Sequence, residues 1–115
     1  MEIILTGNPQ STNNIYRHTG HRVYMTQKGR TLKEDYQWQC KQQYKGKPKT
    51  GNLDVRVELF FGDIRKRDID NYGKLLWDSM SGIIYEDDSQ IQSMLVLKNY
   101  DKKNPRIEVE ITENN

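Results

Sequence analysis

The stretch RKRDIDNYGKLLWDSMSGIIYEDDSQI, residues 65–91, combines a basic triplet with two groups of acidic residues. The triplet is Arg65, Lys66 and Arg67, and the acidic residues are Asp68, Asp70, Asp78, Glu86, Asp87 and Asp88. Carboxylates that converge on one point repel each other, and they stay ionised only when a cation joins them. Mg2+ is commonly held by one or two carboxylates together with waters and substrate phosphates. The stretch therefore predicts metal-dependent chemistry on a phosphodiester.

The spacing of the first two aspartates indicates the backbone that this chemistry needs. Asp68 and Asp70 share a face on an extended strand but point apart on a helix. We therefore expect extended backbone through both residues, then a helix that begins near Asp70 or Asn71 and stops before Gly82. Lys74, four residues after Asp70, would lie one turn along the same helix face. The residues expected on the buried side are Ile69, Leu76 and Met80.

Each of these residues also has an ordinary structural explanation. Aspartates before a helix are common caps, and an Asp–Lys pair four residues apart is usually a surface ion pair worth a few tenths of a kcal/mol. The joint pattern favours a site, because a second acidic group, residues 86–88, follows a short apolar stretch, residues 83–85, that we expect to be a strand. A second acidic group at a strand end would complete a metal site.

Taken together, these residues resemble the RusA family of Holliday junction resolvases. The resemblance rests on Asp68, Asp70, Asn71, Lys74, Asp78, Gly82, Asp87, Asp88, Gln90 and Ile91, with a weaker match at Gly7, Pro9, Asn13 and Tyr16. It implies a small homodimeric endonuclease that uses Mg2+ to cut branched DNA, the four-way junction. It also implies metal-binding catalytic carboxylates at Asp68, Asp70 and Asp88, with Lys74 as a base-like or charge-stabilising residue. Asp87 matches a family position and is assigned a supporting role.

The composition indicates a single domain, residues 1–115, with a thin core. Only 34% of the residues are hydrophobic and 30% are charged. Cys40 is the single cysteine, which excludes an internal disulfide and fits a reducing cytoplasm. The sequence shows no signal peptide and no apolar run near membrane-spanning length, so we expect a cytoplasmic protein without a membrane segment.

The net charge of +2 conceals an asymmetry between the two halves of the chain. Residues 1–50 carry nine basic and three acidic residues, a charge of +6, whereas residues 51–115 carry nine and thirteen, a charge of −4. Basic side chains neutralise backbone phosphates, although lysine-rich surfaces are also simply soluble. The candidate DNA contacts are Arg17, Arg22, Arg65, Lys66 and Arg67.

Hydrophobic periodicity predicts an α+β fold with a mixed β-sheet and two main helices largely on one face, as in the RusA family. Strands are expected at residues 2–6, 53–61, 91–99 and 106–111, a short hairpin at 15–24 and a helix from Thr26 to about Tyr44, with a polar loop at 7–14. The strand at 91–99 is apolar on both sides in its middle, which indicates either a central position or a subunit contact.

Two other functions fit the same residues. One is a non-catalytic DNA-binding or regulatory protein, in which the carboxylates are only caps and turns. The other is a metal-dependent nuclease that acts on other branched DNA or on single strands. A comparison of cleavage on junction, fork, duplex and single-stranded DNA would separate these possibilities.

Overall fold

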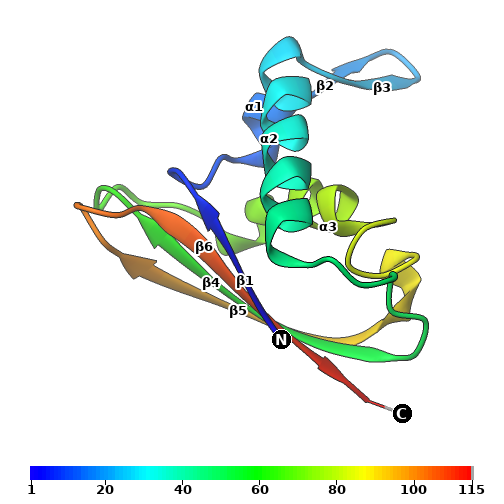
Figure 1. Cartoon of the computed structure of the whole chain (residues 1–115). Coiled ribbons are helices and arrows are strands. Elements are labelled where there is room, and N and C mark those ends of the chain that lie inside the picture. Colours follow the sequence, from blue (N-terminus) through cyan, green and yellow to red (C-terminus); the bar gives the residue numbers. More distant parts are fainter. Residues whose placement is uncertain (115) are drawn as a thin grey trace.

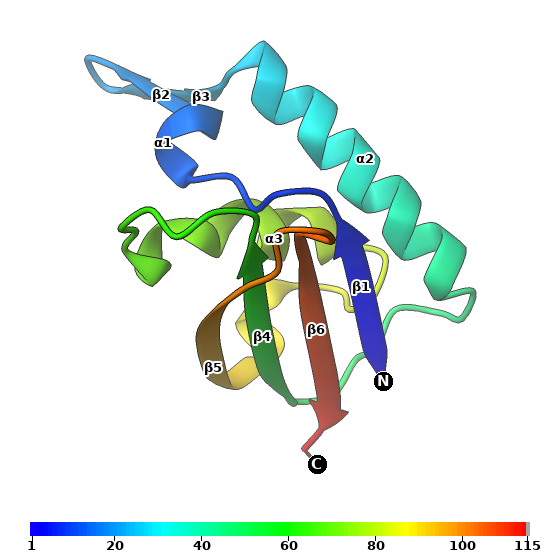
Figure 2. The same cartoon turned by 90° about the vertical axis from the view of Figure 1, so that its left-hand side faces the viewer.

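The strand β4 (Leu53–Phe61) lies inside a four-stranded sheet in the computed structural model, which describes residues 1–114. The strands follow the order β1–β6–β4–β5, where β1 is Glu2–Thr6, β5 is Ile91–Tyr100 and β6 is Arg106–Glu113. β4 pairs in parallel with β5 and antiparallel with β6, and β6 pairs antiparallel with β1. The sheet is therefore mixed, as predicted (Figure 2).

Two helices cover one face of this sheet, and the core lies between the two layers. The helices α2 (Gln27–Gln43) and α3 (Lys74–Met80) lie on the same side (Figure 1). The alternation along β4 explains this arrangement, because its odd-numbered residues are buried and its even-numbered residues are more exposed. The buried residues are Leu53, Val55, Val57, Leu59 and Phe61. The predicted α+β architecture is confirmed.

The helix α2 has the bounds that the sequence predicts, because both of its caps are encoded locally. The hydroxyl of Thr26 accepts a hydrogen bond from the backbone N–H of Gly29 at 3.0 Å and so caps the first turn. Tyr36 and Cys40 face the core and are buried. The helix ends at Gln43, and the following residue, Tyr44, closes its last turn.

Two glutamines of α2 also pair with the edge of β1. The backbone N–H of Thr6 donates to Gln39 Oε1 at 2.9 Å. Gln43 accepts from the Ile4 N–H at 2.8 Å and donates to the Ile4 carbonyl at 2.7 Å. These side chains take the place of a neighbouring strand, so this edge of the sheet is closed to another chain.

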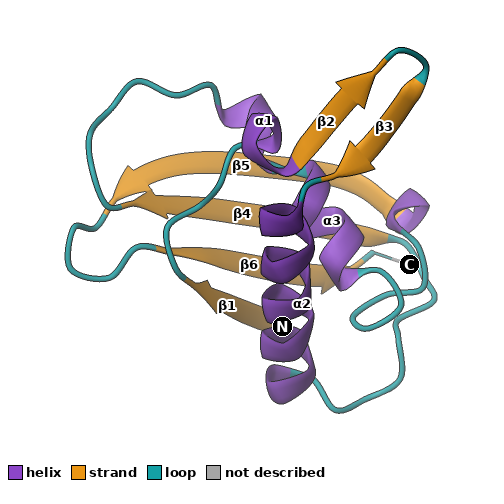
Figure 3. Cartoon of the chain, turned by 90° about the horizontal axis from the view of Figure 1, so that it is seen from above, coloured by secondary structure: helices purple, strands orange, loops and turns teal. Residues whose placement is uncertain are grey.

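The predicted hairpin is present and projects away from the sheet. Its strands, β2 (Tyr16–Thr19) and β3 (Arg22–Met25), pair only with each other within residues 1–114. In the view from above, the hairpin extends beyond the helices (Figure 3). It follows α1 (Thr12–Ile15), a single helical turn capped by Ser11 inside the segment expected to be a loop. The cap chemistry of Ser11 was the missed signal.

Two local predictions are wrong, and one of the two alternatives for the strand at 91–99 is excluded. Residues 83–85 do not form a strand, because Tyr85 makes only isolated bridges to Lys49 and Ser81, although its side chain is fully buried. The strand β5 lies at the edge of the sheet rather than in its centre. Ile69 is 38% exposed instead of buried, whereas Leu76 and Met80 are buried as expected. No helix within residues 1–114 is both long and apolar enough to span a membrane.

Candidate active site

The backbone between β4 and α3 forms one short turn that presents Asp70 to a pocket. This turn, η1 (Ile69–Tyr72), is a 3-10 helix, and Gly73 separates it from α3. The pocket has a volume of about 510 Å³ and lies between η1, α3 and β5. Its lining residues are Ile69, Asp70, Gly73, Lys74, Trp77, Asp78, Asp88, Met94 and Val96. Residues predicted to act together from two distant parts of the chain therefore meet here, and we call this the catalytic pocket.

The carboxylates of Asp70 and Asp88 are the free acidic groups of the catalytic pocket. Both residues are exposed, and neither side chain makes a hydrogen bond or an ion pair with any other part of residues 1–114. Two carboxylates of like charge that face one cavity favour a bound cation. This is the arrangement that the sequence analysis requires of these two residues.

Asp68 does not line the catalytic pocket. The predicted extended backbone through Asp68 and Asp70 is wrong, because the 3-10 turn already begins at Ile69 and leaves Asp68 as the residue before it. The backbone carbonyl of Asp68 accepts from the Asn71 N–H at 3.2 Å, which closes this turn. The two aspartates therefore do not share one face of a strand, and the proposed role of Asp68 remains a prediction.

The catalytic pocket does not contain a complete protein cage for a metal ion. Among residues 1–114, no three His, Cys, Asp or Glu side chains are grouped closely enough to hold one. Mg2+ does not need such a cage, because it usually keeps several waters and takes one or two carboxylates together with substrate phosphates. The unpaired oxygens of Asp70 and Asp88 fit that requirement.

Lys74 is held at the edge of the catalytic pocket by a small polar network. Its Nζ lies 3.6 Å from Asp78 Oδ2 and 5.0 Å from the centre of the Tyr16 ring. The Tyr16 hydroxyl donates to the same Asp78 oxygen at 2.6 Å. Burial, and then this bond to Asp78, raise the pKa of the Tyr16 hydroxyl, so Tyr16 remains a neutral donor. The network connects α3 with the first residue of the hairpin.

Two residues of the second acidic group have different roles: Asp87 stabilises a turn, and Asp88 lines the catalytic pocket. Asp87 caps the 3-10 turn η2 (Asp88–Gln90): its side chain accepts from the Ser89 N–H at 3.1 Å, and its own N–H donates to Gln90 Oε1 at 2.8 Å. The bonds to Ser89 lower the pKa of the Asp87 carboxyl. Because Asp87 holds the turn, it presents Asp88 to the catalytic pocket.

One wall of the catalytic pocket is apolar. It is formed by Ile69, Trp77, Met94 and Val96. Apolar walls lower the local dielectric constant, and charge interactions strengthen accordingly. Met94 and Val96 were not among the predicted site residues. They belong to a continuous apolar run, residues 94–97, so only the pairing of β5 with β4 reveals which of these residues face the site.

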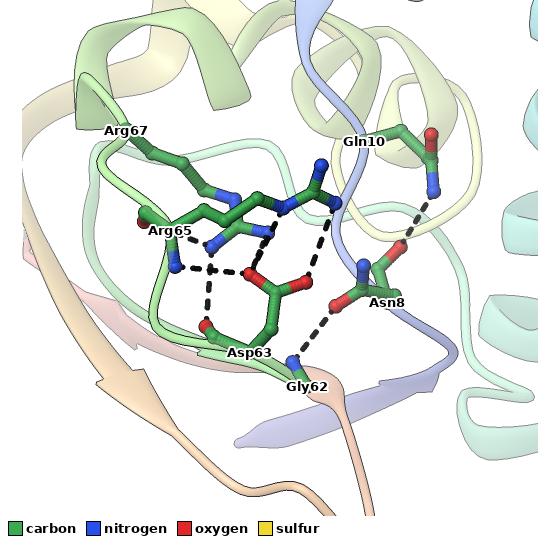
Figure 4. A network of polar contacts seen from close by, with 6 residues as sticks. All are labelled: Asn8, Gln10, Gly62, Asp63, Arg65 and Arg67. Carbon is green, nitrogen blue, oxygen red and sulfur yellow. Dashed lines mark hydrogen bonds and ion pairs between the residues drawn. The ribbon is translucent and has the colours of Figure 1, made fainter.

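Two residues of the basic triplet, Arg65 and Arg67, are organised around Asp63 (Figure 4). The Asp63 carboxylate accepts from the backbone N–H of Arg65 at 3.0 Å and from Arg67 Nη2 at 2.7 Å, and it forms an ion pair with the Arg65 side chain at 3.3 Å. These contacts, led by the backbone bond, lower the pKa of Asp63 to about 2. The guanidinium of Arg67 also lies 4.2 Å from the centre of the Phe61 ring. Arg67 is therefore mainly a structural residue.

The other two predicted DNA contacts lie on the hairpin. The strand register places Arg17 opposite Tyr24, and Arg22 opposite Thr19. Because side chains alternate along a strand, Arg17 and Arg22 share one face of the hairpin with Tyr24. All three residues are exposed. This face is separate from the residues that line the catalytic pocket.

Comparison with known proteins identifies the family. The family model described as "Endodeoxyribonuclease RusA" matches residues 6–112. The chain belongs to the RusA family. The crossover junction endodeoxyribonuclease RusA of Escherichia coli strain K12 is 28% identical over 106 residues, which cover 91% of this chain and 88% of that protein. The RusA proteins of Enterobacteria phages HK97 and 82 are 30% and 28% identical over the same shares.

As a member of the RusA family, the chain is an endodeoxyribonuclease. The resemblance and the enzyme class expected from the sequence are thus confirmed. The network around Asp78 was missed as a functional feature, although a lysine and an aspartate four residues apart on a helix are a recognisable ion-pair signal.

Proposed function

We propose that this chain cuts four-way DNA junctions by Mg2+-dependent hydrolysis of a phosphodiester, with Asp70, Asp88 and Lys74 at the reacting phosphate. The observation that carries this proposal is the meeting of two unpaired carboxylates and one lysine on a single pocket. The printed names of the relatives support the substrate, because they are crossover junction endodeoxyribonucleases.

Asp70 and Asp88 would hold the metal, and Asp68, two residues before Asp70, is a further carboxylate that could bind it or orient a water. When bound, Mg2+ would make a coordinated water more acidic and neutralise charge on the phosphate oxygens. The protein's own contribution is to present the two carboxylates from η1 and η2, neither of which is paired with another side chain of residues 1–114. Phosphate oxygens and waters would complete the coordination.

Lys74 would stabilise the negative charge that develops on the phosphate or on the leaving 3′-oxygen. Preorganised positive groups are effective here because they need no reorganisation during the reaction. Asp78 holds Lys74 in a fixed direction, and the Tyr16 hydroxyl holds Asp78.

We also propose that the chain acts as a homodimer. A four-way junction has approximate two-fold symmetry, and its resolution requires two cuts in opposed strands. A C2 dimer presents two identical sites at one separation. The exposed basic residues Arg17, Arg22 and Lys66 would neutralise phosphates of the junction arms, and Arg65 and Arg67, paired with Asp63, would add net positive charge nearby. This predicts binding that weakens as salt increases.

The test of the site is the variant Asp70→Asn, studied beside Lys74→Ala. Each should lose cleavage of a four-way junction in Mg2+ by a factor of about 10² or more. Asp70→Asn should bind the junction as well as or better than wild type, because it removes a negative charge near phosphate. Glu34→Gln, an exposed carboxylate change on α2, is the matched control. Cleavage by Asp70→Asn at the wild-type rate would exclude the assignment.

The test of the substrate compares a four-way junction, a fork, a duplex and single-stranded DNA in the same gel assay. Paired cuts on the junction with little cleavage of the others would support the proposed function. Equal cleavage of forks or single strands would instead indicate a nuclease of broader specificity. The same reactions without metal test the requirement for Mg2+.

A further inference from the structure

A second pocket adjoins η1, the turn that also lines the catalytic pocket. It is formed by the N-terminal loop at residues 8–11, Asn14 of α1, Lys28 of α2, the basic triplet and Tyr72, and its volume is about 410 Å³. Ile69 and Asp70 of η1 line the catalytic pocket, whereas Tyr72 of the same turn lines this second one. A 3-10 turn of four residues is only about 8 Å long, so the two pockets are close neighbours.

The second pocket is held in shape by interactions at the end of β4. The Phe61 ring contacts the guanidinium of Arg67 and packs edge-on against Tyr72, with ring centres 5.1 Å apart. The backbone N–H of Gly62 donates to the side-chain oxygen of Asn8 at 3.0 Å, which fixes the N-terminal loop beside the triplet (Figure 4). These contacts leave the amide nitrogen of Asn8 as a donor without a partner within residues 1–114.

The basic side chains of the second pocket differ in whether they are paired with a carboxylate. Arg65 and Arg67 are both paired with Asp63, and these three side chains together carry a net charge of +1. Lys28 and Lys66 are exposed and make no hydrogen bond or ion pair within the described residues. The pocket therefore offers two free ammonium groups, and its lining is mostly polar. This combination suits an anion with several oxygens rather than an apolar ligand.

We propose that this basic pocket binds a backbone phosphate of the DNA strand that continues past the cleavage site, with Lys28 and Lys66 as its free cations. The inference rests on the proposed function, because it takes the DNA strand in the catalytic pocket as the source of the phosphate. A strand that crosses η1 would place one phosphate in each pocket. Arg65 and Arg67 then act by holding the loop and the triplet in place, while the two lysines bind the phosphate.

The proposal is tested with the double variant Lys28→Gln/Lys66→Gln on a four-way junction. Binding is measured by fluorescence anisotropy without divalent metal over a series of salt concentrations. We expect an affinity loss of about ten-fold at low salt and a salt slope smaller by about one, as expected for one lost phosphate contact.

The matched control is Lys41→Gln/Lys45→Gln, which removes the same charge at the other end of α2. Lys41 lies thirteen residues from Lys28, or about 20 Å along a helix. The control should retain the wild-type salt slope. If both double variants have the same affinity and slope, the second pocket does not bind phosphate and the proposal is overturned.

A second measurement locates the phosphate. Single neutral methylphosphonate linkages are placed in turn at each position flanking the cut. One position should weaken binding by the wild type but not by Lys28→Gln/Lys66→Gln, and an absence of any such position would overturn the proposal. These readouts need no cleavage, so a wild type that binds but never cuts junctions would refute the proposed function and leave this test intact.

Discussion

Asp78 interacts with two groups at once, and through them it links the catalytic pocket to the hairpin. Its Oδ2 accepts from the Tyr16 hydroxyl at 2.6 Å and lies 3.6 Å from Lys74 Nζ. Lys74 is more than half exposed, so the ion pair alone adds little stability. The ion pair instead orients Lys74, because a long flexible side chain interacts well with a phosphate only when its direction is restricted. Single residues such as this one are where the proposed chemistry can be tested most directly.

Replacement Asp78→Asn should lower the rate of junction cleavage by about 10-fold to 100-fold while binding of the junction is unchanged. The amide oxygen can still accept from Tyr16, but the variant loses the charge that restrains Lys74. The measurement separates kcat from KM, because a role in positioning affects kcat alone. Glu34→Gln serves again as the control. A wild-type kcat in Asp78→Asn would show that Lys74 acts without this partner.

The Asp63 carboxyl should make stability depend on pH in acid. Its pKa in the folded chain is lowered from 3.8 to about 2, first by the Arg65 backbone N–H and then by the two arginine side chains. A group with a lowered folded pKa stabilises the fold above its unfolded pKa, and this stabilisation is lost as pH falls through the folded value. Between about pH 4 and pH 2, wild type should therefore lose more unfolding free energy than Asp63→Asn.

Urea unfolding of both proteins at several pH values between 2 and 5 measures this difference. Glu110→Gln provides the comparison for an exposed carboxylate that has no ion pair within residues 1–114. Titration of the Asp63 carboxyl carbon by NMR gives the pKa directly. An ordinary value near 3.8 would mean that the contacts in Figure 4 do not persist in solution.

At the scale of secondary-structure elements, the junction between α1, the hairpin and α2 is packed unusually closely. Gly29, in the first turn of α2, is buried against the residue before β2 and the last residue of β3. A Cβ at this position would lie 2.7 Å from Ile15 Cγ2, and 2.8 Å from both the Ile15 carbonyl oxygen and Met25 Cγ. The absence of a side chain at Gly29 therefore allows the hairpin to sit on the start of α2.

Gly29→Ala should destabilise the protein, although alanine is normally about 1 kcal/mol better than glycine inside a helix. We expect a loss of about 1–3 kcal/mol in the free energy of unfolding, because overpacking of this size is costly and one of the contacts is with backbone. Thr31→Ala, at an exposed position of the same helix, should be neutral or slightly stabilising. Chemical denaturation compares the two, and equal or greater stability of Gly29→Ala would contradict the packing argument.

On the scale of the whole molecule, the two edges of the sheet differ. The edge at β1 is closed by Gln39 and Gln43, whereas β5 forms the other edge and carries the half-exposed apolar side chains Met94 and Leu95. Unprotected edges with apolar residues tend to pair with another chain. The apolar run in this strand fits either a central position in the sheet or a subunit contact, and only the subunit contact is compatible with a strand at the edge. A subunit contact is consistent with the proposed homodimer.

The dimer prediction is checked by sedimentation. Wild type should have about twice the chain mass of 13.6 kDa, and Leu95→Lys should shift toward the monomer. Val23→Lys changes a side chain of similar exposure on the hairpin, and it should remain dimeric. Dissociation by Val23→Lys alone would place the interface on the hairpin instead of β5. A monomeric wild type at micromolar concentration would contradict the homodimer.

The sequence by itself determined the elements whose signals are local. The alternation in β4, the threonine cap of α2 and the spacing of Asp70, Lys74 and Asp88 predicted the sheet, the long helix and the acidic site, because each depends on side-chain periodicity or on neighbouring backbone. Tertiary structure decided what depends on contacts between distant segments. In the folded chain, β5 lies at an edge of the sheet, and Met94 and Trp77 line the same pocket. The backbone turns at Ile69, so Asp68 does not line that pocket. The Tyr16 hydroxyl is hydrogen-bonded to Asp78. Such contacts depend on how the helices pack on the sheet. The pattern of hydrophobic and polar residues along the sequence does not specify which distant residues come into contact.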